Sequence, residues 1–430
     1  MGGEHAGPVH GSRALSSSAY AAALRRLEGR IVAGIRPGLE TTRLLLSRLG
    51  HPDRAYQVIQ VAGTNGKGST CRFLHRLCQT SGKRTALFTS PHLLSVRERL
   101  VIDEEAIPED EFVALCEVVL PIAEELQATY FETLTAMGAL WFRERGAEIA
   151  VIETGLGGRL DSTTALHASL CGVAQIGLDH TQILGDTIEK IWAEKIAILR
   201  PGGTLLTLEE REPLRESLRE LARERGGHAV FLDPSEAIPF AGIPEGAHQE
   251  RNLALARSLA HLALGRILSK AEVETALRGM VWPGRFQRIP GEPEVILDVG
   301  HNPDAAKLLA GMVSPTRPVL LFGAMRDKDW PQVLGHLGPA CRSVHLAPLE
   351  PQRAATPAEL QTAWHEALVH PSFQEAWSEA CREAREAGVP VLAAGSFHLV
   401  GNTLRCLIGE GRGGFWPLGI TPDPSLPERS

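Results

Sequence analysis

One stretch of the sequence combines residue types suited to binding a phosphate chain. Between Val58 and Thr70 a short apolar segment ends at Gly63, and a glycine-rich turn then carries Lys67 and Ser69 into an amphipathic segment. In such a turn the glycines allow positive φ, backbone N–H groups approach an anion, and the following helix directs its positive end toward it. Lys67 adds a mobile cation. The pattern predicts a strand, a loop and a helix that bind a nucleoside triphosphate.

The turn is a variant of the common phosphate-binding loop, whose pattern is G-x-x-x-x-G-K-[ST]. Val61 stands where the first glycine belongs, and Gly68 stands where the hydroxyl residue after the lysine belongs. A turn that only joins a strand to a helix is the alternative interpretation. The rest of the chain favours phosphate binding.

Polar residues follow three further segments that have the apolar pattern of buried strands. These residues are Ser90, Glu153 and His180, and three glycines within four positions come soon after Glu153. Each residue alone is readily explained as part of a turn. Because ligands gather at the carboxyl ends of strands in open parallel sheets, the three together favour a metal or phosphate site beside the glycine-rich loop.

Length and composition are those of an ordinary globular protein, with 43% hydrophobic and 22% charged residues. The 430 residues exceed what one hydrophobic core usually supports, so we expect two domains. The formal net charge of −7 provides no general basic field, which argues against nucleic acid as a partner.

The seven cysteines are scattered and include no C-x-x-C pair. They are typical of reduced, packed thiols, and they suggest neither a disulfide framework nor a zinc site. No apolar run approaches the ~18 residues of a membrane span, and the N-terminus lacks an apolar export segment. We therefore expect a cytoplasmic protein with no membrane partner.

Helix and strand patterns alternate along the chain, and one cluster of Pro and Gly residues interrupts them. The break runs from Trp282 to Phe286 and continues from Pro290 to Pro293, and a second α/β pattern begins at Val295. The two ends of the chain are rich in small residues or Pro, so residues 1–18 and 411–430 are expected to be flexible tails.

The motifs resemble those of the bacterial folylpolyglutamate synthase and dihydrofolate synthase family, within the Mur ligase group, from about Ile35 to Leu404. Eight landmarks occur in the family's order: Val61 to Ser69, Ser90-Pro91-His92 with Glu98-Arg99, Glu153 to Asp161, Leu178 to Thr181, Glu194-Lys195, Trp282 to Gln287, Asp298 to Pro303, and Gly395 to Phe397. The resemblance implies an α/β protein of two domains. Residues 19–288 would form a P-loop ATP-binding domain with a parallel-rich central sheet, and residues 292–410 a smaller Rossmann-like glutamate-ligase domain.

The resemblance also implies an activity, an ATP-dependent ligation of L-glutamate to dihydropteroate or a reduced folate through an acyl phosphate. A phosphate leaving group is needed because a carboxylate is a poor electrophile. A Mur-type ligase for another carboxylate, and a nucleotide-gated binding protein without ligase activity, are the alternatives. We expect a monomer that binds only small-molecule substrates.

Site residues follow from the same resemblance, position by position. The ATP contacts are Asn65, Gly66, Lys67, Gly68, Ser69, Asn252, Arg285 and Asp298. The metal ligands, for two Mg²⁺ ions, are Ser90, Glu153, His180 and a carbamylated Lys195, and K⁺ is a further candidate ion. The catalytic residues are Lys67, His180, Lys195 and His301. The substrate contacts are Arg99, Phe131, Glu132, Thr133, Gly157, Asp161, His301 and Ser396.

Several of these residues have simpler structural explanations. Lys195 could pair with its neighbour Glu194 at the surface. His301 and Ser396 each stand where a residue could cap a following helix. Phe131 precedes an apolar helix and is as readily explained as a core aromatic.

Overall fold

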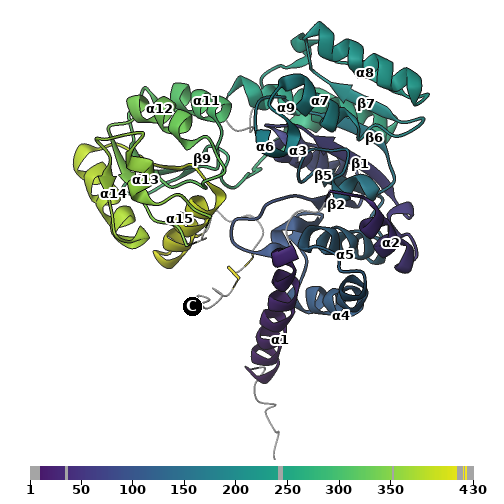
Figure 1. The fold of residues 1–430 in the computed structure, drawn as a ribbon, viewed down its shortest axis with the longest axis horizontal. Helices are drawn as coiled ribbons and strands as arrows, with labels where there is room; N and C mark the ends of the chain where they lie inside the picture. The colour runs from purple at the N-terminus through teal and green to yellow at the C-terminus, as the bar shows by residue number, and fades with distance from the viewer. Residues whose placement is uncertain are drawn as a thin grey trace, which may run out of the picture.

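The computed structural model describes residues 10–33, 37–240, 246–350, 353–413, 420 and 422–423. Ile35, where the family resemblance begins, lies outside the described residues, as do residues 1–9 and most of the predicted C-terminal tail. Figure 1 shows two lobes, one built from the purple-to-teal part of the chain and the other from the green-to-yellow part.

The first lobe is organised around an eight-stranded sheet of order β4-β3-β2-β5-β1-β6-β7-β8. Its strands are β1 (Gln57–Ala62), β2 (Thr85–Phe88), β3 (Leu100–Ile102), β4 (Glu105–Ala106), β5 (Ile149–Glu153), β6 (Ala168–Val173), β7 (Thr204–Thr207) and β8 (His228–Phe231). The strands in the run β2-β5-β1-β6-β7-β8 are all parallel to their neighbours. Strands β3 and β4 form an antiparallel edge next to β2. The register pairs Val61 with Glu153 and Phe88 with Ile152, so β1, β2 and β5 end at the same edge.

Helices cover both faces of this sheet. The side chains of its central strands point alternately to the two faces, and those on both faces are apolar. In β5, Ala150 and Ile152 belong to one buried cluster while Ile149 and Val151 belong to the other. The helices of the lobe are α1 (His10–Glu28), α2 (Glu40–Arg48), α3 (Lys67–Thr80), α4 (Glu109–Glu125), α5 (Tyr130–Glu144), α6 (Thr181–Leu184), α7 (Ile188–Ile196), α8 (Glu212–Glu224), α9 (Ala247–Leu264) and α10 (Lys270–Leu277). Helices α3, α9 and α10 pack on one face, and α1, α4, α5 and α7 on the other.

The second lobe has a six-stranded sheet of order β13-β12-β11-β14-β10-β9. Its strands are β9 (Gln287–Ile289), β10 (Val295–Asp298), β11 (Val319–Phe322), β12 (Ser343–Leu346), β13 (Leu368–Val369) and β14 (Val391–Ala394), and its helices are α11 (Pro303–Val313), α12 (Trp330–Ala340), α13 (Pro357–Gln361), α14 (Phe373–Ala387) and α15 (Phe397–Gly409). Only β9 is antiparallel to its neighbour. The predicted fold class, a parallel-rich sheet followed by a smaller α/β unit, is confirmed.

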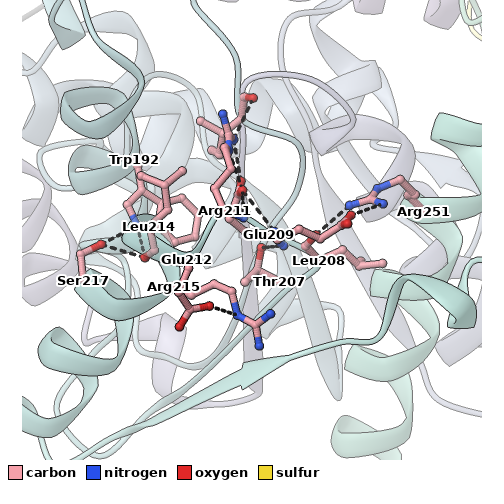
Figure 2. Close-up of polar contacts among 12 residues, drawn as sticks. Trp192, Thr207, Leu208, Glu209, Arg211, Glu212, Leu214, Arg215, Ser217 and Arg251 are labelled. Atoms are coloured by element: carbon pink, nitrogen blue, oxygen red, sulfur yellow. Dashed lines mark hydrogen bonds and ion pairs between the residues drawn. The ribbon is translucent and has the colours of Figure 1, made fainter.

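Helix α7 is held in the first lobe by polar contacts at its buried face (Figure 2). Trp192 is 1% exposed, and its Nε1 donates hydrogen bonds to the carbonyl of Leu214 and to Ser217 Oγ, both 2.9 Å away. Trp192 and Lys195 are three residues apart, so they lie on neighbouring positions of the helix surface. Anchoring Trp192 therefore fixes the direction in which Lys195 points.

The structure differs from the predicted tails in two places. Helix α1 begins at His10 and continues without a break into a stretch that buries Tyr20, Leu24 and Leu27, so residues 10–18 are part of a helix. At the other end, Ile420 is 5% exposed and Asp423 is hydrogen-bonded to the first lobe. No helix in the described part of the chain is long and apolar enough to cross a bilayer.

Candidate functional site

A cavity of about 900 Å³ opens between the two lobes, and residues of both line it. It brings together most of the residues singled out in the sequence, namely Asn65, Gly66, Lys67, Gly68, Ser69, Ser90, Arg99, Glu153, Gly157, His180, Lys195, Asn252, Arg285, Asp298, His301 and Ser396. The carboxyl ends of β1, β2 and β5 form its floor on the first lobe, as expected for a parallel sheet.

The glycine-rich loop has the predicted strand, loop and helix geometry. Strand β1 ends at Ala62 and α3 begins at Lys67, with Gly66 between them at φ 82°. A side chain at Gly66 would overlap the side chain of Asn252, so the loop needs glycine there for its conformation and for space. Lys67 Nζ donates to the carbonyls of Gly63 (2.9 Å) and Thr64 (3.1 Å), which folds the lysine over the loop.

Glu153 places a buried carboxylate beside this loop. Its side chain is on the last residue of β5, it is 4% exposed, and Oε2 accepts a hydrogen bond from the Ser90 amide at 2.9 Å. A Cβ at Gly68 would lie 3.6 Å from each carboxylate oxygen, so the carboxylate faces the start of α3. Burial raises the pKa of Glu153, and the charge of Lys67 acts in the opposite direction.

Lys195 is a second buried cation at the same loop. It is 4% exposed, and its Nζ donates to the carbonyl of Gly63 at 2.9 Å. Burial, with the nearby charge of Lys67, lowers the pKa of Lys195 to about 7. Its neighbour Glu194 pairs with Arg159 (Nη2 to Oε1, 2.8 Å), so the surface pair considered as an alternative for Lys195 is not what the structure contains.

An ion pair joins the two lobes above this floor. Lys328, in the loop between β11 and α12, donates to Asp179 Oδ1 at 2.8 Å and lies 3.0 Å from His180 Nε2. His301 Nε2 is 3.7 Å from Asp179 Oδ2. Burial would raise the pKa of the Asp179 carboxyl, but the interaction with His301 and the charge of Lys328 hold it well below its usual range. Burial lowers the pKa of His180 to about 4, so this imidazole is neutral near pH 7.

Asp179 and Lys328 were not among the predicted site residues. Asp179 stands next to His180 in a landmark of the family, and Lys328 lies in a charged segment, residues 326–329, that follows the buried strand β11. The rule that polar residues after parallel strands gather at one sheet edge could have identified Lys328. Its contact with a residue 149 positions away could not be read from local sequence.

The segment that links the lobes also contributes to the cavity. Asp298 accepts hydrogen bonds from the amides of Phe286 (2.9 Å) and Gly300 (2.7 Å), which fixes the turn after β10. The Arg285 guanidinium lies 5.3 Å from the ring centroid of Phe397. Together these contacts hold one carboxylate and one guanidinium at the wall of the cavity.

His301 and Ser396 occupy different positions relative to their helices. Ser396 is the N-cap of α15, where its Oγ accepts from the Leu399 amide (3.1 Å) and donates to the carbonyl of Gly323 (2.9 Å). The N-cap of α11 is Asn302, so His301 does not have the capping role considered as its alternative. Asn302 also donates to Asn65 Oδ1 at 2.8 Å, a second direct contact between the lobes.

Four predicted substrate residues do not line the cavity. Phe131 is partly buried against the core of the first lobe, and Glu132 forms a capping box with Thr129 at the start of α5. Thr133 donates to the Thr129 carbonyl at 2.8 Å. Asp161 is the N-cap of the short helix Ser162–Ala165. The polar groups of Glu132, Thr133 and Asp161 are engaged in local hydrogen bonds, as expected for buried polar side chains.

The donor set of the first lobe fits one magnesium ion. Glu153 supplies a carboxylate and Ser90 a hydroxyl, and Mg²⁺ prefers oxygen ligands. Whether a second magnesium ion fits at His180 depends on the charges of Lys195 and Lys328. As ammonium groups, these two side chains would repel a divalent cation. Among the described residues no group of three or more His, Cys, Asp or Glu side chains is arranged to hold a metal ion.

Comparison with known proteins finds one matching family model and several relatives that are similar over most of this chain. Residues 284–397 match the model described as Mur ligase, glutamate ligase domain. The chain is 32% identical over 420 residues to the dihydrofolate synthase/folylpolyglutamate synthase of Escherichia coli K12, with 93% of this chain and 98% of that protein covered. It is 34% identical over 409 residues to a probable bifunctional folylpolyglutamate synthase/dihydropteroate synthase of Haloferax volcanii, covering 85% of this chain and 48% of that protein. The chain therefore spans about half the length of the second relative.

Solved structures agree with these relatives. Escherichia coli FolC in complex with DHPP and ADP has a TM-score of 0.79 and 30% identity, covering 91% of this chain and 98% of that one. A bifunctional folylpolyglutamate synthase/dihydrofolate synthase with Mn, AMPPNP and L-glutamate bound has a TM-score of 0.79 and 28% identity, covering 90% and 98%.

Proposed function

The chain belongs to the dihydrofolate synthase/folylpolyglutamate synthase family, and we propose that it is an ATP-dependent ligase that joins L-glutamate to dihydropteroate, to reduced folates, or to both. The observation that carries the proposal is the facing arrangement in one cavity of Lys67 and Glu153 on the first lobe with His301 and Lys328 on the second. A site of this kind can hold a triphosphate, a carboxylate and an amino acid together.

The first step requires two anions to meet. A carboxylate oxygen of the pteroate or folate attacks the γ-phosphorus of ATP, the bond to the oxygen bridging the β- and γ-phosphorus breaks, and ADP leaves. Lys67 and the amides of the glycine-rich loop are proposed to bind the β- and γ-phosphates, and Arg285 to approach from the linker. Ser90 and Glu153 would hold a magnesium ion, whose charge neutralises phosphate oxygens.

The second step forms the amide. The amine of L-glutamate attacks the carbonyl carbon of the acyl phosphate, the tetrahedral intermediate loses phosphate, and one proton leaves the nitrogen. We propose that His301, Arg99 and Ser396 help to bind the carboxylates of the glutamate. Closing the cavity between the lobes excludes water, which would otherwise hydrolyse the acyl phosphate.

A carbamylated Lys195 belongs to the same proposal. Its pKa of about 7 leaves much of the amine neutral at physiological pH, and a neutral amine can attack CO₂ to form an N–C bond with release of a proton. The product is an anion in place of a cation in the cavity that His180 also lines. This change would remove a positive charge that repels a second magnesium ion at His180. We also propose K⁺ as a further bound ion.

The domain limits and the state of the protein in the cell are also proposed. Strand β9 pairs with β10, so we place the start of the second domain at Gln287, slightly before the predicted limit of residue 292. All seven cysteines are free, and all except Cys406 are buried, which suits a reducing cytoplasm. We propose a monomer that acts on small molecules and binds no nucleic acid or membrane.

Release of ADP by the purified protein tests the activity. Turnover should require ATP, Mg²⁺, L-glutamate and either dihydropteroate or a reduced folate, and it should stop when any one is omitted. Turnover that is unchanged by the folate-type substrate and glutamate would support the nucleotide-gated alternative and refute the ligase. Turnover with glutamate and a different carboxylate only would support another Mur-type ligase.

A further inference from the structure

Asp423, near the end of the chain, is hydrogen-bonded to two distant parts of the first lobe. Its Oδ1 accepts from the Tyr20 hydroxyl at 2.6 Å and from Ser95 Oγ at 2.7 Å, and its Oδ2 accepts from the Val96 amide at 2.8 Å. Its own amide donates to the carbonyl of Leu94 at 2.9 Å. A carboxylate that accepts three hydrogen bonds while its backbone makes a fourth is built into the structure.

The second lobe also contacts Asp423 and the loop at residues 93–96. Arg405 of α15 donates to the carbonyl of Asp423 at 3.3 Å and to that of Leu94 at 3.4 Å. A Cβ at Gly401, one turn earlier in α15, would lie 2.5 Å from the carbonyl oxygen of Leu93, so helix and loop are in close contact. Asp423 thus lies where α1, the loop at residues 93–96 and α15 meet.

The loop that Asp423 holds leads directly to a predicted substrate residue. Ser95 caps the short helix Val96–Arg99, and the Glu98 carboxylate accepts hydrogen bonds from the amide of Ser95 and those of the two residues before it. At the end of this helix Arg99 Nε donates to His92 Nδ1 at 2.9 Å, and its guanidinium lies 5.5 Å from the ring centroid of Tyr130. His92, Arg99 and Tyr130 all line the cavity.

The two oxygens of Asp423 accept from different kinds of donor. The hydroxyls of Tyr20 and Ser95 share Oδ1, and the Val96 amide, which can only donate, needs an acceptor at the position of Oδ2. Burial, with the negative charge of Asp423, raises the pKa of Tyr20, which therefore remains a donor at neutral pH. An alanine removes both acceptors, whereas an asparagine could keep the Val96 contact, because the two hydroxyls can accept from its NH₂ group.

We propose that Asp423 is a positioning residue for the substrate carboxylate that Arg99 binds. By fixing Ser95 and Val96 it sets the start of the short helix that ends in Arg99, and so the orientation of the guanidinium in the cavity. The carboxylate can come from L-glutamate or from the glutamyl end of a folate. This inference rests on the ligase function proposed above.

Hydrogen exchange and kinetics test the proposal on the full-length protein. In Asp423→Ala, the Val96 amide should exchange about tenfold faster or more, because it loses a hydrogen bond to a charged acceptor. The KM for one carboxylate substrate should rise by about tenfold, while the KM for ATP stays unchanged, and measuring glutamate and the pteroate or folate separately identifies which one. Tyr20→Phe removes one donor and should give a smaller effect in the same direction.

Asp233→Ala is the matched control, since Asp233 also accepts from a backbone amide, that of Ser235 at 2.8 Å, but it is at the surface and outside the cavity. It should leave exchange at Val96 and all KM values unchanged. Unaltered exchange at Val96 in Asp423→Ala would overturn the contact, and faster exchange with no change in any KM would overturn the positioning role. If the wild type shows no ligase turnover, the proposed function fails and the positioning role falls with it, although exchange at Val96 still reports whether the contact exists.

Discussion

The ion pair between Lys328 and Asp179 gives the sharpest prediction, because it links the lobes and has an exposed counterpart elsewhere in the chain. Lys328→Met keeps the length of the side chain and removes its charge. Asp179 would then remain ionised beside His180 and His301 without its cationic partner. We expect the ligand-free protein to lose stability and the ligase to lose turnover.

The size of the effect follows from distance and burial. At 2.8 Å and an effective dielectric constant of about 20, two unit charges attract by about 6 kcal/mol before desolvation is subtracted. Removing one partner from a buried pair typically costs about 3–5 kcal/mol. The Lys328 and Asp179 side chains are 10% and 14% exposed, so we take the lower end, about 3 kcal/mol.

Urea unfolding of the ligand-free Lys328→Met protein measures this loss, and a double-mutant cycle with Asp179→Asn isolates the coupling between the two side chains. Lys190 and Asp186 form the control pair, since their atoms are also 2.8 Å apart but the side chains are 62% and 77% exposed. For this pair the coupling should be much smaller, because solvent and salt screen exposed charges. If both cycles give the same small value, burial does not strengthen the pair between the lobes and the reasoning is refuted.

Three further predictions concern the loop, the glutamate site and acid stability. Lys67→Ala should reduce ADP formation by about 10³-fold or more, because it removes a cation from the phosphates, and near-normal turnover would contradict this role. His301→Ala should raise the KM for glutamate by about tenfold with a smaller effect on kcat, and an unaltered KM with normal turnover would argue against glutamate binding. Burial would raise the pKa of Glu104, but His75 and the charge of Arg72 lower it to about 2. Its stabilising effect should therefore be present above pH 4.5 and disappear as the pH falls toward 2, so urea midpoints of Glu104→Gln should vary less over this range than those of the wild type.

The structural features of the site that the sequence predicted depend on local residue patterns and on the rule that parallel strands end at the same edge of a sheet. The strand, loop and helix around Lys67 follow from the sequence of apolar residues, glycines and an amphipathic segment. Glu153 and Ser90 meet because β5 and β2 are parallel neighbours that end together, which any open parallel sheet would impose.

The parts that were missed depend on contacts between distant residues. Lys328 and Asp179 are 149 positions apart, and Tyr20 and Asp423 are 403 apart. No periodicity or motif connects such pairs, so the C-terminal segment was expected to be a flexible tail. By contrast, the role of Glu132 was readable, because Thr129 and Glu132 have the T-x-x-E spacing of a capping box.

The division of the site between two lobes has a physical consequence for the order of events. Under the proposed function, the first lobe supplies Lys67 to bind the triphosphate and Glu153 to help hold its metal ion. The cations that would face the transferred phosphate from the other side, Arg285 and Lys328, come from the linker and the second lobe. We therefore expect nucleotide binding to precede closure of the lobes and carboxylate activation to depend on closure. A reactive acyl phosphate would then form only when the glutamate-binding lobe is already in place, which protects it from water.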